Sequence, residues 1–177
     1  MKVSMFFLTL FYSFCFSVSA QTDDFQETVI TYLNSNGTQQ QYNMAYDEMF
    51  GILKEQFLNV PEKEWSALKV GKKGRVQEVI GMLAGVYGQH FSELDIEQMT
   101  SFYKTETARK LVSGSSDLSD EDKNKINSFF ESQIGKKIAS KAEVLSAGIE
   151  EVSSNWSRDL FFEKRDALLS KGYAIKD

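Results

Sequence analysis

Apolar residues recur along most of this chain at steps of three and four, which places them on one face of an α-helix. One stripe of apolar and aromatic residues consists of Tyr42, Tyr46, Met49, Leu53 and Phe57. A longer stripe lies later in the chain and consists of Ile138, Ala142, Leu145, Ile149, Val152 and Trp156. The alternation of apolar and polar residues that marks a half-buried strand is nearly absent. The pattern therefore predicts an all-α chain.

Breaker and capping residues divide the chain into a bundle of about seven helices. We expect one helix over residues 22–33, ended by the polar stretch 34–37. A short helix should carry Pro61 at its first position, where proline is favoured. The segment 71–75, Gly-Lys-Lys-Gly-Arg, is expected to be a solvated basic loop, because its spacing does not match a phosphate-binding loop. A further amphipathic helix should then run as far as Tyr87.

Two neighbouring segments, residues 91–112 and 118–139, align without a gap at an offset of 27 residues. Each opens with an apolar residue and then Ser-x-x-Asp, a helix start in which the serine oxygen accepts from a first-turn amide and the carboxylate reaches back. Each continues with an aromatic pair, a hydroxyl residue that could cap a second helix, and a basic pair. The matched positions are Ser92/Ser119, Asp95/Asp122, Phe102-Tyr103/Phe129-Phe130, Thr105/Ser132 and Arg109-Lys110/Lys136-Lys137. We interpret the two segments as an internally duplicated helix-turn-helix unit.

Residues 128–138 of the second segment carry an aromatic pair, a small polar residue and then Gly-Lys. In this they resemble the signature of a secreted bacterial family known only as domain of unknown function 2059. The resemblance extends over about residues 87–147, with a weaker echo in residues 40–57. The family often has proline where this chain has Gln133, and glycine where the first segment has Ala108. The resemblance implies a small, all-helical, exported protein, and it brings with it no activity, cofactor or ligand.

Residues 1–20 have the pattern of an export signal: one charge at Lys2, an apolar run over residues 5–16 and a small-residue ending. The apolar run is shorter than the roughly 20 residues that a membrane span needs. We expect cleavage after Ala20, which leaves residues 21–177 as one domain in the periplasm or outside the cell. The alternative is an uncleaved amino-terminal anchor. No stable membrane insertion is expected after cleavage.

Composition narrows the chemistry further. Cys15 falls inside the signal, so the mature chain would contain no cysteine and a single histidine, His90. This argues against disulfides, thiol catalysis and zinc or copper sites, and no cofactor is expected. Removing Lys2 with the signal takes the formal charge from −5 to −6, which argues against nucleic-acid binding. The acidic stretch 117–122 lacks the central glycine and alternating oxygen ligands of a calcium loop, so we interpret it as a helix start.

The recurring aromatic and basic pairs are the candidate ligand- or partner-binding surface, because they occupy the same places in both segments. The six candidate residues are Tyr103, Phe130, Arg109, Lys110, Lys136 and Lys137. The alternative is structural: one ring of each pair would lie in the core, and the basic residues would lie on solvated helix faces. His90 could act as a general base only with a carboxylate beside it, and otherwise we expect a packed, hydrogen-bonded histidine at a helix end.

These observations predict a non-catalytic envelope or secreted protein that binds a protein partner. Two alternatives remain open at this point. One is a hydrolase of unknown class that uses His90 with a nearby carboxylate. The other is a carrier of apolar ligands between the duplicated helices. The stripe over residues 138–156 would also suit a homodimer.

Overall fold

The computed structural model describes residues 17–176, with side chains from residue 23 onward. Its helices are α1 (Ser17–Ser35), α2 (Thr38–Gln56), α3 (Glu62–Leu68), α4 (Lys72–Gly88), α5 (Glu93–Tyr103), α6 (Glu106–Val112), α7 (Asp120–Glu131) and α8 (Gln133–Ser170). Within residues 17–176 there is no strand, and a single antiparallel bridge joins Phe57 to Ile175. The predicted all-α bundle is therefore confirmed.

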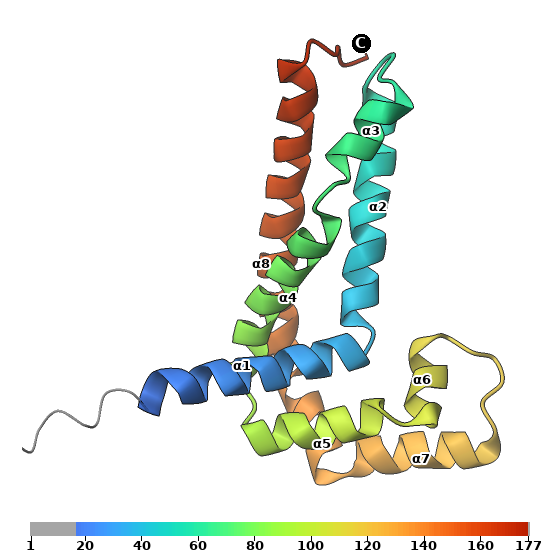
Figure 1. Ribbon diagram of the computed structural model, residues 1–177. Helices are drawn as coiled ribbons and strands as arrows, with labels where there is room; N and C mark the ends of the chain where they lie inside the picture. The colour runs from blue at the N-terminus through green and yellow to red at the C-terminus, as the bar shows by residue number, and fades with distance from the viewer. Residues whose placement is uncertain (1–16, 177) are drawn as a thin grey trace, which may run out of the picture.

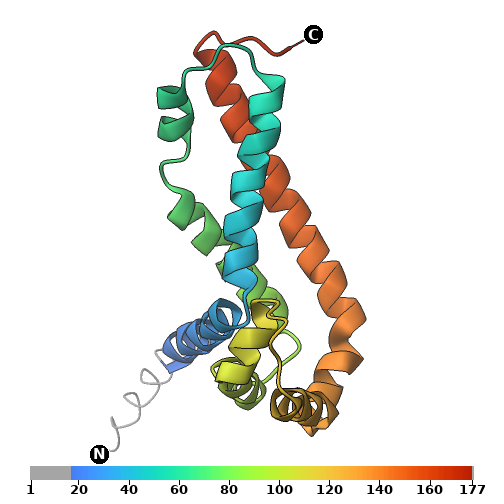
Figure 2. The same cartoon turned by 90° about the vertical axis from the view of Figure 1, so that its right-hand side faces the viewer.

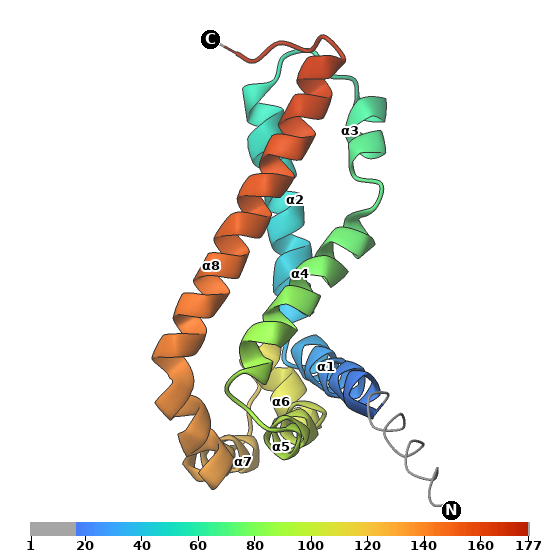
Figure 3. The same cartoon turned by 90° about the vertical axis from the view of Figure 1, so that its left-hand side faces the viewer.

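Three long helices, α2, α4 and α8, run side by side along the molecule (Figure 1). The helices α1, α5, α6 and α7 gather at the end opposite the C-terminus (Figure 2). Helix α8 extends from α7 at that end to the C-terminal segment at the other (Figure 3). There the C-terminal segment returns to the end of α2, where the amide of Lys176 donates to the carbonyl of Gln56 over 2.8 Å.

The two apolar stripes read from the sequence supply much of the core. From α2, Tyr46, Met49 and Leu53 are buried, and from α8, Leu145 and Trp156 are buried. The stripes meet where the rings of Tyr42 and Trp156 pack edge to face at 5.4 Å. Since the stripe on α8 faces its own chain, it contributes to an intramolecular core, and a homodimer stays a prediction.

The prediction of a basic loop at residues 71–75 is wrong, because α4 already begins at Lys72. Gly71 precedes it in the left-handed conformation, with φ of 90°, which glycine adopts without steric cost. Cations in the first turn of a helix oppose its dipole. Two of the cations here have acidic partners, since Lys72 pairs with Asp47 at 2.7 Å and Arg75 pairs with Glu163 of α8.

Two other predictions concern the ends of elements. Pro61 is the residue before α3 rather than its first helical residue. Most of the predicted export signal lies outside the described residues, and α1 begins at Ser17 and continues past the predicted cleavage point after Ala20. Among the residues that the structure describes, no helix combines the length and the apolar character needed to cross a membrane.

Candidate functional site

The two predicted helix starts have the same geometry. At α5, the Ser92 oxygen accepts from the Asp95 amide at 3.3 Å, and the Asp95 carboxylate accepts from the Ser92 amide at 2.8 Å. At α7, Ser119 and Asp122 make the same two bonds at 3.1 and 3.2 Å. Both are complete capping boxes, which satisfy amides that a helix start would otherwise leave without partners.

Each capping-box carboxylate is also bound by a lysine from the other segment. Lys110 donates to Asp122 at 3.0 Å, and Lys137 donates to Asp95. The two ion pairs are equivalent once the segments are exchanged. Lys137 occupies the position of Lys110, and Asp95 that of Asp122, each at the offset of 27 residues.

The contacts of the aromatic pairs are also related by exchanging the two segments. Phe102 stacks on Phe129, its counterpart, with ring centroids 3.9 Å apart and planes 3° from parallel. Around this central pair, Phe102 meets Phe130 edge-on at 6.3 Å, and Tyr103 meets Phe129 edge-on at 6.2 Å. Contacts of this kind relate the two segments by a local twofold arrangement, although the duplication of the unit stays a prediction.

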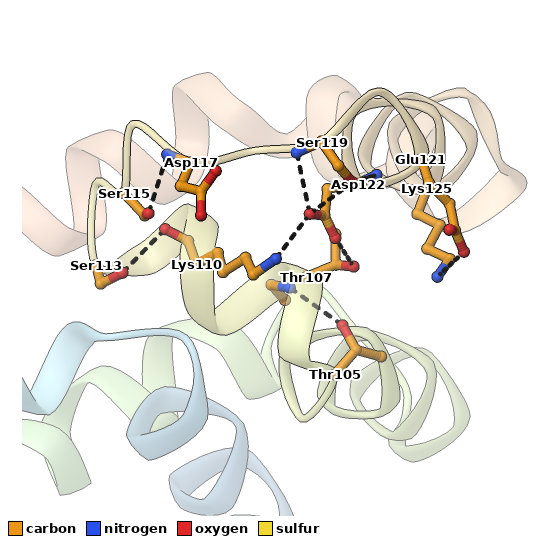
Figure 4. A network of polar contacts seen from close by, with 11 residues as sticks. Thr105, Thr107, Lys110, Ser113, Ser115, Asp117, Ser119, Glu121, Asp122 and Lys125 are labelled. Carbon is orange, nitrogen blue, oxygen red and sulfur yellow. Dashed lines mark hydrogen bonds and ion pairs between the residues drawn. The ribbon is translucent and has the colours of Figure 1, made fainter.

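Asp122 has the denser environment of the two carboxylates. Its side chain is 10% exposed and accepts from Thr107 at 2.6 Å, from Lys110, and from Ser119 (Figure 4). These hydrogen bonds, that from Thr107 first, hold the pKa of Asp122 well below its ordinary value. The position equivalent to Thr107 in the second segment is Ile134, which cannot donate a side-chain hydrogen bond.

Asp95 therefore has fewer partners than Asp122. Burial alone would raise the pKa of Asp95, but hydrogen bonds from Lys137 and from Ser92 together outweigh that effect and lower it. Both carboxylates are thus held in the charged form by hydrogen bonds within their capping boxes and by the contacts that join the two segments.

A hollow of about 670 Å³ lies between α6 and α7 beside Asp122, and we call it the paired-charge hollow. Its lining residues are Phe102, Thr105, Glu106, Thr107, Lys110, Ser119, Glu121, Asp122, Asn124, Lys125 and Ser128. Both lysines of this lining have a carboxylate partner, since Lys110 binds Asp122 and Lys125 binds Glu121 at 2.6 Å.

A second hollow, of about 580 Å³, lies where the turn between α1 and α2 meets the end of α5 and the helix α6. We call it the amide hollow. It is lined by Asn34, Ser35, Gly37, Gln39, Gln40, Asn43, Tyr103, Lys104, Arg109, Val112 and Ser113. This lining includes four side-chain amides and two cations, and it contains no acidic residue.

The cations of the amide hollow, Lys104 and Arg109, are exposed. The ion pairs found among residues 23–176 are all made by other basic residues. In a chain with a formal charge of −5, two neighbouring cations without acidic partners in the described part form a local basic site.

The turn that forms one wall of the amide hollow depends on Gly37. Its φ of 89° is costly for any residue with a side chain. A Cβ atom at this position would also lie 2.5 Å from Cγ1 of Val112 on the opposite wall. Asn36 fixes the same turn, because its side-chain oxygen accepts from the amide and hydroxyl of Thr38 at 3.0 and 2.7 Å.

The structure divides the six candidate residues among different places. Tyr103 and Arg109 line the amide hollow, and Lys110 lines the paired-charge hollow. Lys137 is held by Asp95, as described above. Lys136 is exposed, and Phe130 is 45% exposed at the edge of the aromatic cluster. The candidates therefore do not form one continuous surface.

The amides of the second hollow are residues that the sequence patterns did not single out. Asn34 begins the predicted break at residues 34–37, and Gln39 and Gln40 follow it. The sequence offers one signal for this hollow, which is the concentration of amide side chains around a helix break. The basic pair that contributes Arg109 lies far along the chain from that break. Nothing in the sequence alone indicated that α6 packs beside this turn.

His90 lies in the turn after α4 and is half buried, and its backbone amide donates to Tyr87 at 2.9 Å. Among residues 23–176, where side chains are described, its ring makes no hydrogen bond, so the hydrogen-bonded histidine expected at this helix end is not found there. It lines neither of the two hollows. The arrangement gives no carboxylate partner for general base chemistry in the described part of the chain.

Comparison with known protein families finds a match for part of the chain. Residues 77–122, from α4 to the capping box of α7, match a family model described as "Uncharacterized protein conserved in bacteria (DUF2059)". The match includes the whole first segment and only the beginning of the second, whereas the motif pointed to residues 87–147. No curated protein and no solved structure matches the chain. The resemblance is therefore confirmed, and over residues 77–122 the chain is similar to this uncharacterised bacterial family.

Proposed function

We propose that the protein is a non-catalytic module, exported to the periplasm or beyond, that binds a protein partner through the amide hollow. The observation that carries this proposal is the placement of Lys104 and Arg109 beside four side-chain amides in a lining without acids. Amide side chains donate and accept hydrogen bonds, and cations bind carboxylates, so the lining can hydrogen-bond a peptide main chain and pair with acidic side chains. Its volume lies within the range of about 300–1,000 Å³ typical of ligand sites.

The contents of the space between the duplicated helices favour this proposal over a carrier of apolar ligands. That space is occupied by Phe102 and Phe129, whose ring centroids are 3.9 Å apart. Stacked rings at this distance leave no room for a third apolar group between them. Each hollow borders this cluster through one ring, Phe102 or Tyr103, and its lining combines polar and charged side chains with apolar surface.

Site-specific photocrosslinking in the native cells tests the proposal. A benzophenone amino acid replaces Gln40 in the amide hollow or, as a matched control, Asn124 in the paired-charge hollow. Both positions are exposed and line a hollow of similar size. We expect a crosslinked species from position 40 that is absent from position 124, and that is lost when Arg109→Ala is added. Recovery of the uncrosslinked chain alone, or equal crosslinking from both positions, would contradict the proposal.

A further inference from the structure

We infer that the amide hollow takes an extended acidic peptide segment, with Arg109 and Lys104 binding its carboxylates and the neighbouring amides binding its main chain. The inference rests on the proposed function and specifies the chemistry of the partner. It concerns a site on the α1–α2 turn and on α6, which the conserved-family match covers only in part, since residues 34–43 lie outside it.

Charge is the first reason for an acidic ligand. The whole chain is acidic, yet the lining of this hollow has two basic residues and no acidic one. Lys104 caps the C-terminal end of α5 and Arg109 lies within α6, so two separate elements bring their cations to the same hollow. A guanidinium can bind a carboxylate through two parallel hydrogen bonds, whereas an ammonium acts as a compact point charge. The pair is therefore suited to two carboxylates along one segment.

The amides are the reason for a peptide. Asn43 already donates to the carbonyl of Gln39 at 2.8 Å, which leaves its side-chain oxygen as an acceptor. The side-chain amides of Asn34, Gln39 and Gln40 make no hydrogen bond to other groups in residues 23–176. A peptide main chain presents both N–H donors and C=O acceptors, which amides match on both counts. A fully ionised phosphate offers acceptors only and would leave the amide oxygens without partners.

The aromatic residue of the lining favours a peptide over a sugar. Tyr103 packs against Tyr32 at 5.7 Å, Phe102 at 5.2 Å and Phe129 at 6.2 Å. Its ring is therefore committed to the aromatic cluster, and burial raises the pKa of its hydroxyl, which stays neutral. The opposite wall contributes Val112, which is 37% exposed and can contact an apolar side chain of the segment.

Fluorescence anisotropy with a labelled octaglutamate peptide tests the inference on the full chain. We expect octaglutamate to bind and octaglutamine to bind at least about tenfold more weakly, because an uncharged segment lacks the ion pairs. Binding should weaken as ionic strength rises, since exposed charges are screened. Octaglutamate methylated on alternate main-chain nitrogens should also bind more weakly, because those donors are removed. Equal binding of the charged and uncharged peptides would overturn the inference.

A matched pair of double variants separates this site from general electrostatics. Lys104→Ala/Arg109→Ala and Lys123→Ala/Lys125→Ala each remove two exposed cations, and the second pair lies on α7. We expect the first double variant to weaken octaglutamate binding at least about tenfold and the second to change it by less than about twofold. Equal losses would overturn the inference. So would competition by inorganic phosphate or by an anionic polysaccharide as strong as that by unlabelled octaglutamate.

Failure of the inference is distinguishable from failure of the proposed function. If octaglutamate does not bind while position 40 still crosslinks to a partner, the inference about acidic chemistry is wrong. If octaglutamate binds through Lys104 and Arg109 while position 40 yields no partner in cells, the proposed function is wrong.

Discussion

The two hollows on either side of α6 both contain two basic side chains. In the paired-charge hollow both are bound by carboxylates, whereas the lining of the amide hollow contains no acidic residue. Thr107 and Lys110 point from α6 toward Asp122, and their polar groups are used within the chain. Arg109, next to Lys110 in the sequence, lines the other hollow, where the lining offers it no carboxylate. One basic pair therefore contains a residue that joins two segments and a residue that remains available to a ligand.

The second basic pair divides in the same way. Lys137 binds the capping-box carboxylate of Asp95, and Lys136 is exposed. In both pairs the later residue connects the two segments. Substitutions that affect the segment-joining residues and the exposed cations separately test whether the comparison holds.

The largest effect should come from the aromatic cluster that borders both hollows. Phe129 stacks on Phe102, a residue of the paired-charge hollow, and meets Tyr103, a residue of the amide hollow. Phe129→Ala should lower the free energy of unfolding by about 3 kcal/mol, because it leaves a gap in this cluster. Urea unfolding measures the change. Phe130→Ala, at an exposed ring, is the control and should cost about 1 kcal/mol or less; an equal loss would mean that the cluster is not central.

The next effect concerns the amide hollow alone. Gly37→Ala should lower the free energy of unfolding by about 2 kcal/mol, since alanine is strained at a φ of 89° and its Cβ would meet Val112. Gly71→Ala is a matched control: its φ is 90°, but no atom lies within 4 Å of the added Cβ, so it should cost about 1 kcal/mol.

Thermal unfolding of both glycine variants and of Gly37→Ala/Val112→Ala checks the cause. Removing the methyl groups of Val112 should recover part of the loss at Gly37, because it relieves the contact and leaves only the backbone strain. Equal losses at Gly37 and Gly71, with no recovery in the double variant, would show that the two walls of the hollow do not touch.

Acid should affect the paired-charge hollow and not the amide hollow. The folded-state pKa of Asp122 is depressed, so its contribution to stability is present above the unfolded pKa near 4 and is lost as pH falls through the lower folded value. Urea midpoints should therefore decline below about pH 4–5, and less steeply in Asp122→Asn. The control is Asp120→Asn, which removes an exposed carboxylate of the same turn. If Asp122→Asn kept the full acid dependence, the carboxylate would not be linked to folding.

How far the sequence could anticipate this structure depends on the range of the interaction. The apolar steps predicted α2 and α8, and Ser-x-x-Asp predicted the starts of α5 and α7, because stripes and capping boxes are encoded within a few residues. The sequence of segment 71–75 predicts a loop because three of its five residues are basic and the sequence alone shows no acidic partner for them. Its partners Asp47 and Glu163 lie on α2 and α8, which no local pattern connects to it.

The candidate site shows the same limit. Tyr103 and Arg109 were named from their recurrence in the two segments, and both line the amide hollow. The recurrence could not show that Lys110 and Lys137 would bind carboxylates of the opposite segment, since that depends on how the segments pack. It also could not reveal Gln39 and Gln40, which reach the hollow from a helix that is not part of the repeated unit.

The smallest expected effect on stability is at the two cations of the amide hollow. Lys104→Ala/Arg109→Ala should change the free energy of unfolding by no more than about 0.5 kcal/mol, because exposed side chains without internal partners contribute little to folding. Urea unfolding at neutral pH measures this change, and the same preparation is used for the octaglutamate titration. A loss of stability comparable to that of Phe129→Ala would show that these cations, like Lys110 and Lys137, are structural. If stability is retained and peptide binding is lost, the cations of the amide hollow bind the ligand, whereas Lys110 in the paired-charge hollow stabilises the fold. Only a cation without a partner in the fold can be removed without destabilising it.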